Sequence, residues 1–244
     1  MILIPMLGNS SRFFNSGYSV PKYELLLGEK SVLEHVLDSF AAYFESDSFV
    51  FGVRKDFNAS DFVYRAVNTV GINSFEIIEF ESTTSGQATS VSQMLARSSF
   101  SSPDEELVVF NADSFIDNFT KPAIPEGVSG CLDVFHGVGD HWSFVKPGEG
   151  STVLQTAEKQ RISDLCSNGL YYFDCVETFE MGYRMMVAND DRVNGEFYVA
   201  PIYNYLIEQG RRVRYRLVRN SQTVLCGTPE EYETLRNSNW NGFS

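Results

Sequence analysis

The sequence predicts an α/β fold whose central sheet is mixed but mostly parallel and carries helices on both faces. Two patterns support this prediction. Over roughly the first half of the 244 residues, short apolar runs alternate with longer amphipathic stretches. Strands separated by helices imply right-handed crossovers, and hence parallel strands buried on both faces. Beyond about Gly130, short strands are joined by turn signals such as Pro147-Gly148, which indicates antiparallel strands added to the same sheet.

The first half of the chain supplies the predicted parallel strands and their helices. Residues 2–6 are a predicted buried strand, and residues 8–17 are a polar loop that contains glycine. Residues 31–43 are a predicted helix, because Ser31 and Glu34 fit a capping box in front of apolar residues at helical spacing. The other predicted elements are a strand at 49–53, a helix at 61–70, a strand at 75–80, a helix at 84–96 and a strand at 107–110.

The second half is predicted to extend the same sheet. Strands are predicted at 131–137, 142–146, 153–157, 169–173 and 212–218, and helices at 176–187 and 197–209. No proline- or serine-rich linker and no internal repeat divides the sequence. Residues 1–244 are therefore predicted to form a single domain.

Composition excludes several classes of function. The chain has 32 acidic and 19 basic side chains and a formal charge of −13, so it lacks the basic face that broad nucleic-acid binding needs. A small phosphorylated ligand stays compatible, because it needs only a few cations in a cleft. No apolar run approaches the roughly 18 residues of a membrane helix, and residues 1–7 are too short for a signal peptide. Four cysteines without metal spacing fit reduced thiols. A cytoplasmic protein that binds neither nucleic acid nor membrane is predicted.

The loop after the first predicted strand is the segment richest in chemistry. Its glycine, asparagine and serine residues leave unpaired backbone N–H groups beyond the carboxyl end of the strand, where they can hold phosphate oxygens. Arg12 can fork onto the same oxygens, and Lys22 can add a compact charge from the far end of the loop. Taken alone, the pattern also fits a turn at Gly8 with solvated cations. It lacks the Gly-Lys-Ser/Thr run of a Walker phosphate loop.

Six blocks beyond this loop connect the chain to a known family. The loop itself ends in Arg12-Phe13 and is followed by Pro21-Lys22. The six blocks are Thr84-Ser85-Gly86-Gln87-Ala88, Asn111-Ala112-Asp113, Glu158-Lys159, Ser167-Asn168-Gly169-Leu170-Tyr171-Tyr172-Phe173, Gly195-Glu196-Phe197-Tyr198-Val199-Ala200-Pro201 and Gly227-Thr228-Pro229-Glu230. In their order and spacing the chain resembles the sugar-nucleotidyltransferases, also called nucleoside-diphosphate-sugar pyrophosphorylases. It is most similar to small bacterial members that serve surface-polysaccharide synthesis.

The resemblance implies a Rossmann-like nucleotidyltransferase fold of the GT-A-like type. It implies a nucleotide-binding half at residues 1–125 and an acceptor-binding half at residues 126–244. Its partners would be a nucleoside triphosphate (NTP) and a phosphorylated small-molecule acceptor, and its cofactor would be Mg²⁺. On the nucleotide side, the resemblance implies a phosphate loop at Leu7, Gly8, Asn9, Ser10 and Ser11, a base contact at Gly86 and Gln87, and catalytic roles for Arg12, Lys22 and Asp113, with Asp113 also the metal ligand.

On the acceptor side, the resemblance implies a pocket formed by Glu158, Lys159, Asn168, Gly169 and Glu196. Glu158 would accept hydrogen bonds from hydroxyl groups, and Lys159 would meet the acceptor's phosphate. Each of these residues also has an ordinary structural interpretation. Gly86 and Gln87 are also typical of a helix N-terminus, and Asp113 is typical of a turn or a helix cap. Glu158-Lys159 is typical of a solvated face. Glu196 fits a metal ligand, a contact to a sugar hydroxyl or the start of the following helix.

The sequence departs from the family pattern at three places. Ser10 stands where the family loop usually carries a second glycine, and Leu7 stands where a small residue is usual. Serine is tolerated there unless the backbone needs a positive φ. Several relatives place a second metal-binding aspartate just before the Gly-Thr motif, where this chain has Leu225-Cys226. Either Glu196 substitutes for it, or Asp113 holds the metal together with phosphate oxygens.

The reaction implied by the resemblance is attack of an acceptor phosphate oxygen on the α-phosphorus of an NTP, with release of pyrophosphate. The leading acceptor is a sugar 1-phosphate. The alternative is a CTP-dependent cytidylyltransferase that acts on phosphocholine, a phosphonate or another phosphorylated metabolite. A nucleotide-binding regulatory protein without catalysis is an alternative of another class. A glycosyltransferase is disfavoured, because Asp113-Ser114-Phe115 does not supply an Asp-x-Asp motif. The base, the acceptor and the oligomeric state, a homo-oligomer included, stay open.

Overall fold

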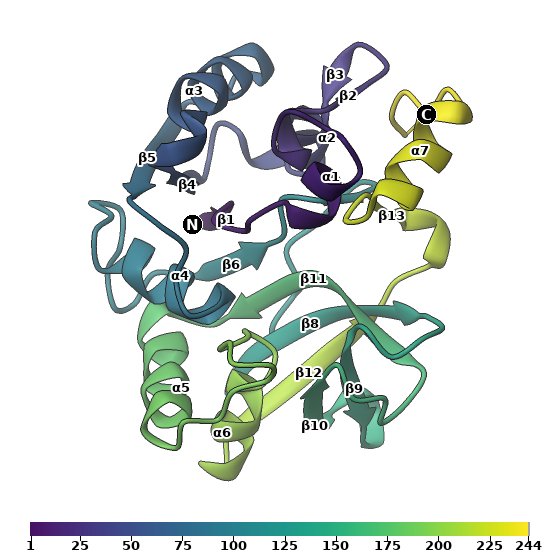
Figure 1. The fold of residues 1–244 in the computed structure, drawn as a ribbon. Coiled ribbons are helices and arrows are strands. Elements are labelled where there is room, and N and C mark those ends of the chain that lie inside the picture. The colour runs from purple at the N-terminus through teal and green to yellow at the C-terminus, as the bar shows by residue number, and fades with distance from the viewer. Residues whose placement is uncertain (244) are drawn as a thin grey trace.

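The structure is a computed structural model that describes residues 1–243. Within those residues, nine strands form one sheet: seven follow the order β10-β9-β11-β6-β1-β4-β5, β8 also pairs with β11, and β12 pairs with β8 (Figure 1). The strands are β1 Ile2–Pro5, β4 Ser48–Arg54, β5 Ser74–Phe80, β6 Leu107–Phe110, β8 Val128–His136, β9 Ser143–Pro147, β10 Val153–Glu158, β11 Leu165–Phe173 and β12 Arg212–Leu217.

The centre of the sheet is parallel. β1 pairs in parallel with β4 on one side and with β6 on the other, and β4 pairs in parallel with β5. β11 then runs antiparallel to β6, β8 and β9, and β10 runs antiparallel to β9. The predicted mixed sheet, in which antiparallel strands of the second half extend the parallel strands of the first, is confirmed.

Helices cover both faces of this sheet, as predicted. Ile2 and Ile4 of β1 pack in a buried hydrophobic cluster with α2 and α3. Met1 and Leu3 pack in a second cluster with α4, α5 and α6. Alternate residues of a strand point to opposite faces, so a strand covered on both sides must be apolar throughout. The helices are α1 Ser11–Asn15, α2 Val32–Asp38, α3 Ala59–Val70, α4 Gln87–Leu95, α5 Val176–Ala188, α6 Ile202–Glu208 and α7 Pro229–Asn237.

Two small sheets and five short 3-10 helices complete the described part of the chain. One small sheet pairs β7 (Ser114–Ile116) with β13 (Thr223–Leu225), and so brings a late segment of the chain beside the segment that follows β6. The other pairs β2 (Leu26–Leu27) with β3 (Lys30–Ser31). The 3-10 helices are η1 Lys22–Glu24, η2 Ala41–Tyr43, η3 Lys55–Phe57, η4 Glu149–Ser151 and η5 Asn220–Gln222.

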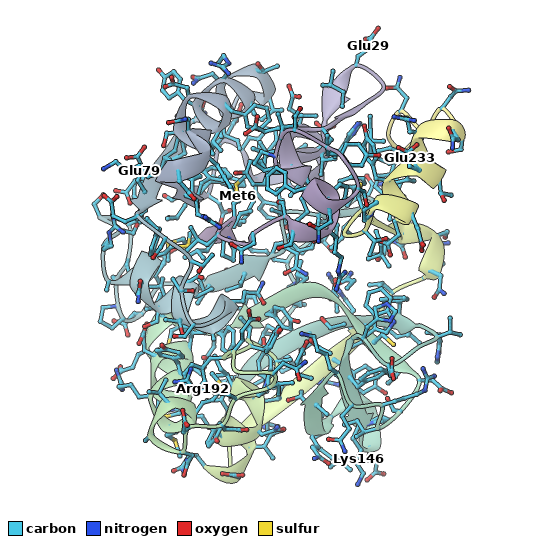
Figure 2. The ribbon with its side chains drawn as sticks, viewed as in Figure 1. Met6, Glu29, Glu79, Lys146, Arg192 and Glu233 are labelled. Carbon is cyan, nitrogen blue, oxygen red and sulfur yellow. The ribbon has the colours of Figure 1, made fainter. Side chains whose placement is uncertain are left out.

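Most charged side chains lie at the periphery, although Asp133 of β8 and Glu158 of β10 are buried in the sheet. Figure 2 shows Met6, which follows β1, near the centre of the molecule, and Glu29, Glu79 and Lys146 toward its edges. Among residues 1–243, no helix is long and apolar enough to cross a membrane.

Several predicted boundaries in the first half are wrong, for local reasons. The predicted loop at 8–17 contains a short helix, α1. The predicted helix at 31–43 begins with the expected Ser31–Glu34 capping box, but its α-helical part ends at Asp38 and a 3-10 turn follows. The predicted helix at 84–96 starts only at Gln87, because Gly86 has a φ of 123° that no α-helix accommodates.

The second half holds two further differences. The predicted helix at 197–209 starts at Ile202, because Phe197 is used for backbone pairing: its N–H donates to Ser85 and its carbonyl accepts from Ala88. α7 was not predicted, although Thr228 and Glu231 form a capping box and Pro229 occupies the first turn.

Candidate functional site

A cavity of about 610 Å³ opens beyond the carboxyl ends of β1 and β6. Parallel α/β sheets place ligands at this edge. All predicted site residues except Lys159 line the cavity. Residues that the sequence reasoning did not assign also line it, among them Asn111, Trp142, Ser143, Tyr171, Tyr198 and Glu231.

The loop between β1 and α1 forms one wall and presents backbone donors. The backbone N–H groups of residues 7–10 donate to no group within the part of the chain that the structure describes. A Cβ built at Gly8 would meet no protein atom within 4 Å. The chain's own packing therefore does not require glycine there, and the free space lies open for close approach of a ligand. The loop thus offers the donors and the space that phosphate oxygens need.

Ser10 adopts the left-handed conformation, with φ 50° and ψ 24°. A non-glycine residue in this region is strained by about 1–2 kcal/mol. The departure from the family pattern at Ser10 therefore has a structural consequence, because the position does need a positive φ. The Ser10 hydroxyl oxygen accepts a hydrogen bond from the Lys22 backbone N–H at 3.3 Å, which ties the loop to the segment that carries Lys22.

Lys22 and Asp113 meet in this cavity. The Lys22 ammonium donates a hydrogen bond to Oδ2 of Asp113, and their side chains are 25% and 18% exposed. Lys22 begins η1, and Asp113 follows β6, so the contact joins two segments far apart in the sequence. Arg12, in the first turn of α1, lines the same cavity. Two cations and a carboxylate thus face the space beside the free N–H groups.

The Gly227-Thr228 segment packs against Asp113. The Cys226 N–H donates to the Asp113 carbonyl at 2.8 Å, and a Cβ at Gly227 would lie 2.9 Å from Asp113 Oδ2. Glu231 Oε2 accepts from the N–H groups of Gly227 and Thr228, each at 2.9 Å. The missed capping box thus brings a second carboxylate to this end of the cavity.

The chemistry of these donors fits Mg²⁺. Mg²⁺ is usually held by one or two carboxylates together with waters and substrate phosphates, rather than by a cage of protein ligands. Asp113 supplies a hard carboxylate beside the phosphate loop. Among residues 1–243, no group of three or more His, Cys, Asp or Glu side chains is arranged to hold a metal. Glu196 instead accepts a hydrogen bond from the Tyr198 hydroxyl at 2.7 Å.

The segment before α4 forms a second wall. Gly86 lies so close to the backbone of Phe197 that a Cβ would be 2.4 Å from its carbonyl oxygen. The Gln87 side-chain amide donates to Asn111 Oδ1 at 2.7 Å. A Cβ at Gly169 would in turn lie 2.2 Å from Asn111 Nδ2. Asn111, which the sequence reasoning left without a role, therefore contacts both the predicted base segment and the predicted acceptor segment.

Glu158 is a buried carboxylate in the other half of the cavity. It is 8% exposed, and it accepts a hydrogen bond from the Ser143 hydroxyl, which also bonds to the Tyr171 hydroxyl at 3.1 Å. Burial raises the pKa of Glu158 above its ordinary value, and the Ser143 hydrogen bond and the charge of Lys159 only partly oppose this. The nearby charge of Glu196 raises the pKa further. A solvated Glu-Lys pair, the alternative drawn from the sequence, does not describe Glu158.

Lys159 is placed differently from the expectation, whereas Asn168 lines the cavity but uses its amide within the protein. The Lys159 ammonium lies 4.3 Å from the centre of the Tyr198 ring and donates to the Tyr198 hydroxyl. Asn168 is buried, and both ends of its amide are used by the protein: Nδ2 donates to Thr223 Oγ1 at 3.2 Å, and Oδ1 accepts from the Leu170 N–H at 3.2 Å. Asn168 therefore shapes the wall, while Lys159 lies beside the cavity.

Comparisons with known proteins give one near relative and several distant ones. No protein-family model matches the chain, and no curated protein matches it. A solved nucleoside-diphosphate-sugar pyrophosphorylase from Vibrio cholerae RC9 is 43% identical, with a TM-score of 0.90 over 97% of this chain and 100% of that chain. The inositol-1-phosphate CTP transferase from T. maritima matches with a TM-score of 0.75 at 12% identity, over 100% of this chain and 97% of that one. A UDP-glucose pyrophosphorylase complexed with UDP-glucose matches with a TM-score of 0.71 at 14% identity, over 97% of each chain. The two distant matches show a common fold.

Proposed function

Because the chain belongs to the nucleoside-diphosphate-sugar pyrophosphorylase family, we propose that it transfers a nucleoside monophosphate from an NTP to a sugar 1-phosphate and releases pyrophosphate. The observation that carries this proposal is the meeting of Arg12, Lys22 and Asp113 in one cavity with the free N–H groups of residues 7–10. Those groups are what a triphosphate needs, and they lie at the edge of the sheet where α/β proteins bind ligands.

The reaction is a displacement at the α-phosphorus. An oxygen of the acceptor phosphate forms a bond to this phosphorus, and the bond to the bridging oxygen breaks, so that pyrophosphate leaves with the electron pair. Two anions must approach each other, so positioning and charge neutralisation are the main tasks of the protein. The proposed roles are contact of Arg12 with the leaving phosphates and contact of Lys22 with the α-phosphate.

The cofactor we propose is Mg²⁺, held by Asp113. When bound, it would neutralise the charge of the triphosphate and polarise its phosphorus. Lys22 contacts only Oδ2 of Asp113, and we propose that its ammonium moves from this oxygen to a phosphate oxygen when nucleotide binds. The protein therefore exchanges one ion pair for another as nucleotide binds.

The nucleobase is proposed to lie on Gly86 and Gln87. Gly86 brings backbone to the cavity wall without a side chain, and the Gln87 amide is held by Asn111. An oriented amide presents a defined hydrogen-bonding edge to a base. This arrangement supports a single preferred base without identifying it.

The acceptor is proposed to lie against Glu158, Gly169 and Glu196. Glu158 is buried beside Ser143 and Tyr171, so its carboxylate is a strong acceptor for sugar hydroxyl groups. Lys159 is proposed to turn from Tyr198 toward the acceptor phosphate. A cytoplasmic location and a place in surface-polysaccharide synthesis stay predictions.

The experiment that tests the proposal is a pyrophosphate-release panel. Five triphosphates (ATP, GTP, CTP, UTP and dTTP) are each combined with Mg²⁺ and with a set of hexose 1-phosphates, phosphocholine and an alkylphosphonate. Release that depends on one hexose 1-phosphate and one NTP supports the proposal. Release only when CTP is combined with phosphocholine or the alkylphosphonate contradicts the sugar 1-phosphate acceptor and supports the cytidylyltransferase alternative. Nucleotide binding without pyrophosphate release in any combination contradicts the proposed activity and supports a nucleotide-binding regulatory protein.

A further inference from the structure

Arg54 lies just outside the cavity and holds one of its loop residues. It is the last residue of β4, which pairs in parallel with β1, so its side chain lies at the same edge of the sheet as the loop after β1. The Arg54 guanidinium donates through Nη1 to Oδ1 of Asn9. Arg54 does not line the cavity, whereas Asn9 does.

The guanidinium is held on two further sides. Nε donates to Oδ1 of Asp56 at 2.9 Å, and Nη2 donates to the other oxygen of the same carboxylate. The Phe57 ring lies 4.2 Å from the guanidinium carbon. Phe57 also packs against Phe14 of α1, with ring centres 5.7 Å apart. The guanidinium has little freedom to move, because Nε and Nη2 are paired with Asp56 and its face is stacked on Phe57. Its Nη1 donor is therefore directed at Asn9.

This contact sets the orientation of the Asn9 amide. A guanidinium has only donors, so it must take the amide oxygen of Asn9. The NH₂ group of the amide is then the end left for a ligand, and a phosphate oxygen accepts from it. Without Arg54, the amide could present its oxygen instead, which repels a phosphate. Asp56 neutralises the guanidinium, so the main effect of Arg54 is on geometry.

We propose that Arg54 is a positioning residue for the triphosphate, and that it acts by turning the donor end of Asn9 into the cavity. This inference rests on the proposed function only in taking a triphosphate as the ligand of the loop. It adds a residue that lies outside the cavity, on a different strand from the loop it serves.

The test measures binding of inorganic tripolyphosphate by isothermal titration calorimetry, since this probe needs neither base nor turnover. Arg54→Met and Asn9→Ala should each weaken binding at least about tenfold, as expected for one hydrogen bond to a charged group. The double variant should bind no more weakly than Asn9→Ala alone, because both changes remove the same donor. Asn9→Asp keeps a partner for Arg54 but lacks the NH₂ group and adds a negative charge, so it should bind at least as weakly as Asn9→Ala.

Arg97→Met is the matched control. Its guanidinium also lies on a phenylalanine ring, 4.7 Å from the centre of Phe80, and it is not among the residues that line the cavity. Its affinity for tripolyphosphate should equal that of the wild type. Thermal unfolding checks each variant, and Asn9→Ala and Asn9→Asp change only an exposed loop residue.

Three outcomes overturn the inference: no binding of tripolyphosphate by the wild type, wild-type affinity in folded Arg54→Met, or multiplied losses in the double variant. The proposed function fails separately, when the wild type releases no pyrophosphate in the panel. If the protein binds tripolyphosphate through Arg54 and Asn9 but releases no pyrophosphate, the inference about Arg54 holds and the proposed activity is contradicted.

Discussion

The ammonium of Lys22 contacts the carboxylate of Asp113 across the cavity, although 91 positions separate the two residues in the chain. Each of these groups is assigned a different partner in the proposed reaction, a phosphate for Lys22 and a metal ion for Asp113. In the free protein they neutralise each other. In the proposed reaction, nucleotide and metal therefore compete with a pair that is already formed.

The first prediction concerns divalent cations in the absence of nucleotide. Lys22→Met should raise the affinity for Mn²⁺ by about tenfold or more, because a unit positive charge about 4 Å away opposes a divalent cation by about 2 kcal/mol even in water. Electron paramagnetic resonance of free Mn²⁺ measures this directly. Lys30→Met, which removes the exposed Lys30–Asp38 pair, is the control and should change nothing. An unchanged or lower Mn²⁺ affinity in Lys22→Met would contradict the competition.

The second prediction concerns turnover. Lys22→Ala and Asp113→Asn should each lower kcat by roughly 10²–10³-fold, as expected when one preorganised electrostatic group is lost from a reacting centre. Pyrophosphate release under saturating substrates measures kcat. Folded variants that turn over as fast as the wild type would show that these residues have no role in the reaction.

The third prediction concerns Gly86. Gly86→Ala should lower the free energy of unfolding by more than about 3 kcal/mol, because a Cβ would strike the Phe197 backbone at a φ of 123°. Gly71→Ala separates the two causes: Gly71 has φ 89° and nothing within 4 Å of its Cβ, so only strain of about 1 kcal/mol is expected. Urea unfolding measures both. Equal losses at the two positions would show that the contact with Phe197 yields easily.

The fourth prediction concerns pH. Burial raises the pKa of Glu158, so on acidification this carboxylate takes up a proton before an exposed glutamate does. A protonated Glu158 accepts fewer hydrogen bonds from hydroxyl groups, so the acceptor's KM should rise as the pH falls through the raised pKa. In Ser143→Ala the rise should begin at higher pH, because the Ser143 hydrogen bond lowers the pKa of Glu158. Glu158→Gln should remove this dependence. The measurement is acceptor KM against pH with NTP saturating, and a curve unaltered by either variant argues against a role for Glu158.

The parallel core could be predicted because its signals are local. The strand at 49–53 is apolar at every position except Gly52, since both faces are covered, and the Ser31–Glu34 capping box lies within four residues. The Thr228–Glu231 capping box with Pro229 in the first turn is a local signal of the same kind, and it is sufficient to predict α7.

The rest could not be predicted because it depends on long-range contacts. Phe197 carries apolar character that fits a helix, yet its backbone pairs with Ser85 and Ala88 more than 100 positions away. The position of Lys159 on the Tyr198 ring and the link between Gln87 and Asn111 are set in the same manner. Periodicity reports which residues are buried, but it does not report which distant polar groups meet.

Ser10 has a consequence for how tightly the phosphate loop is held before any ligand arrives. Glycine at this position would adopt the left-handed conformation without strain, but it would also raise the conformational entropy of the unfolded chain. Serine lowers the conformational entropy of the unfolded chain, but its backbone is strained in the left-handed conformation. Because the strain at a positive φ outweighs this entropic gain, Ser10 populates the bend of the free loop less firmly than glycine would, and Ser10→Gly should stabilise the bend.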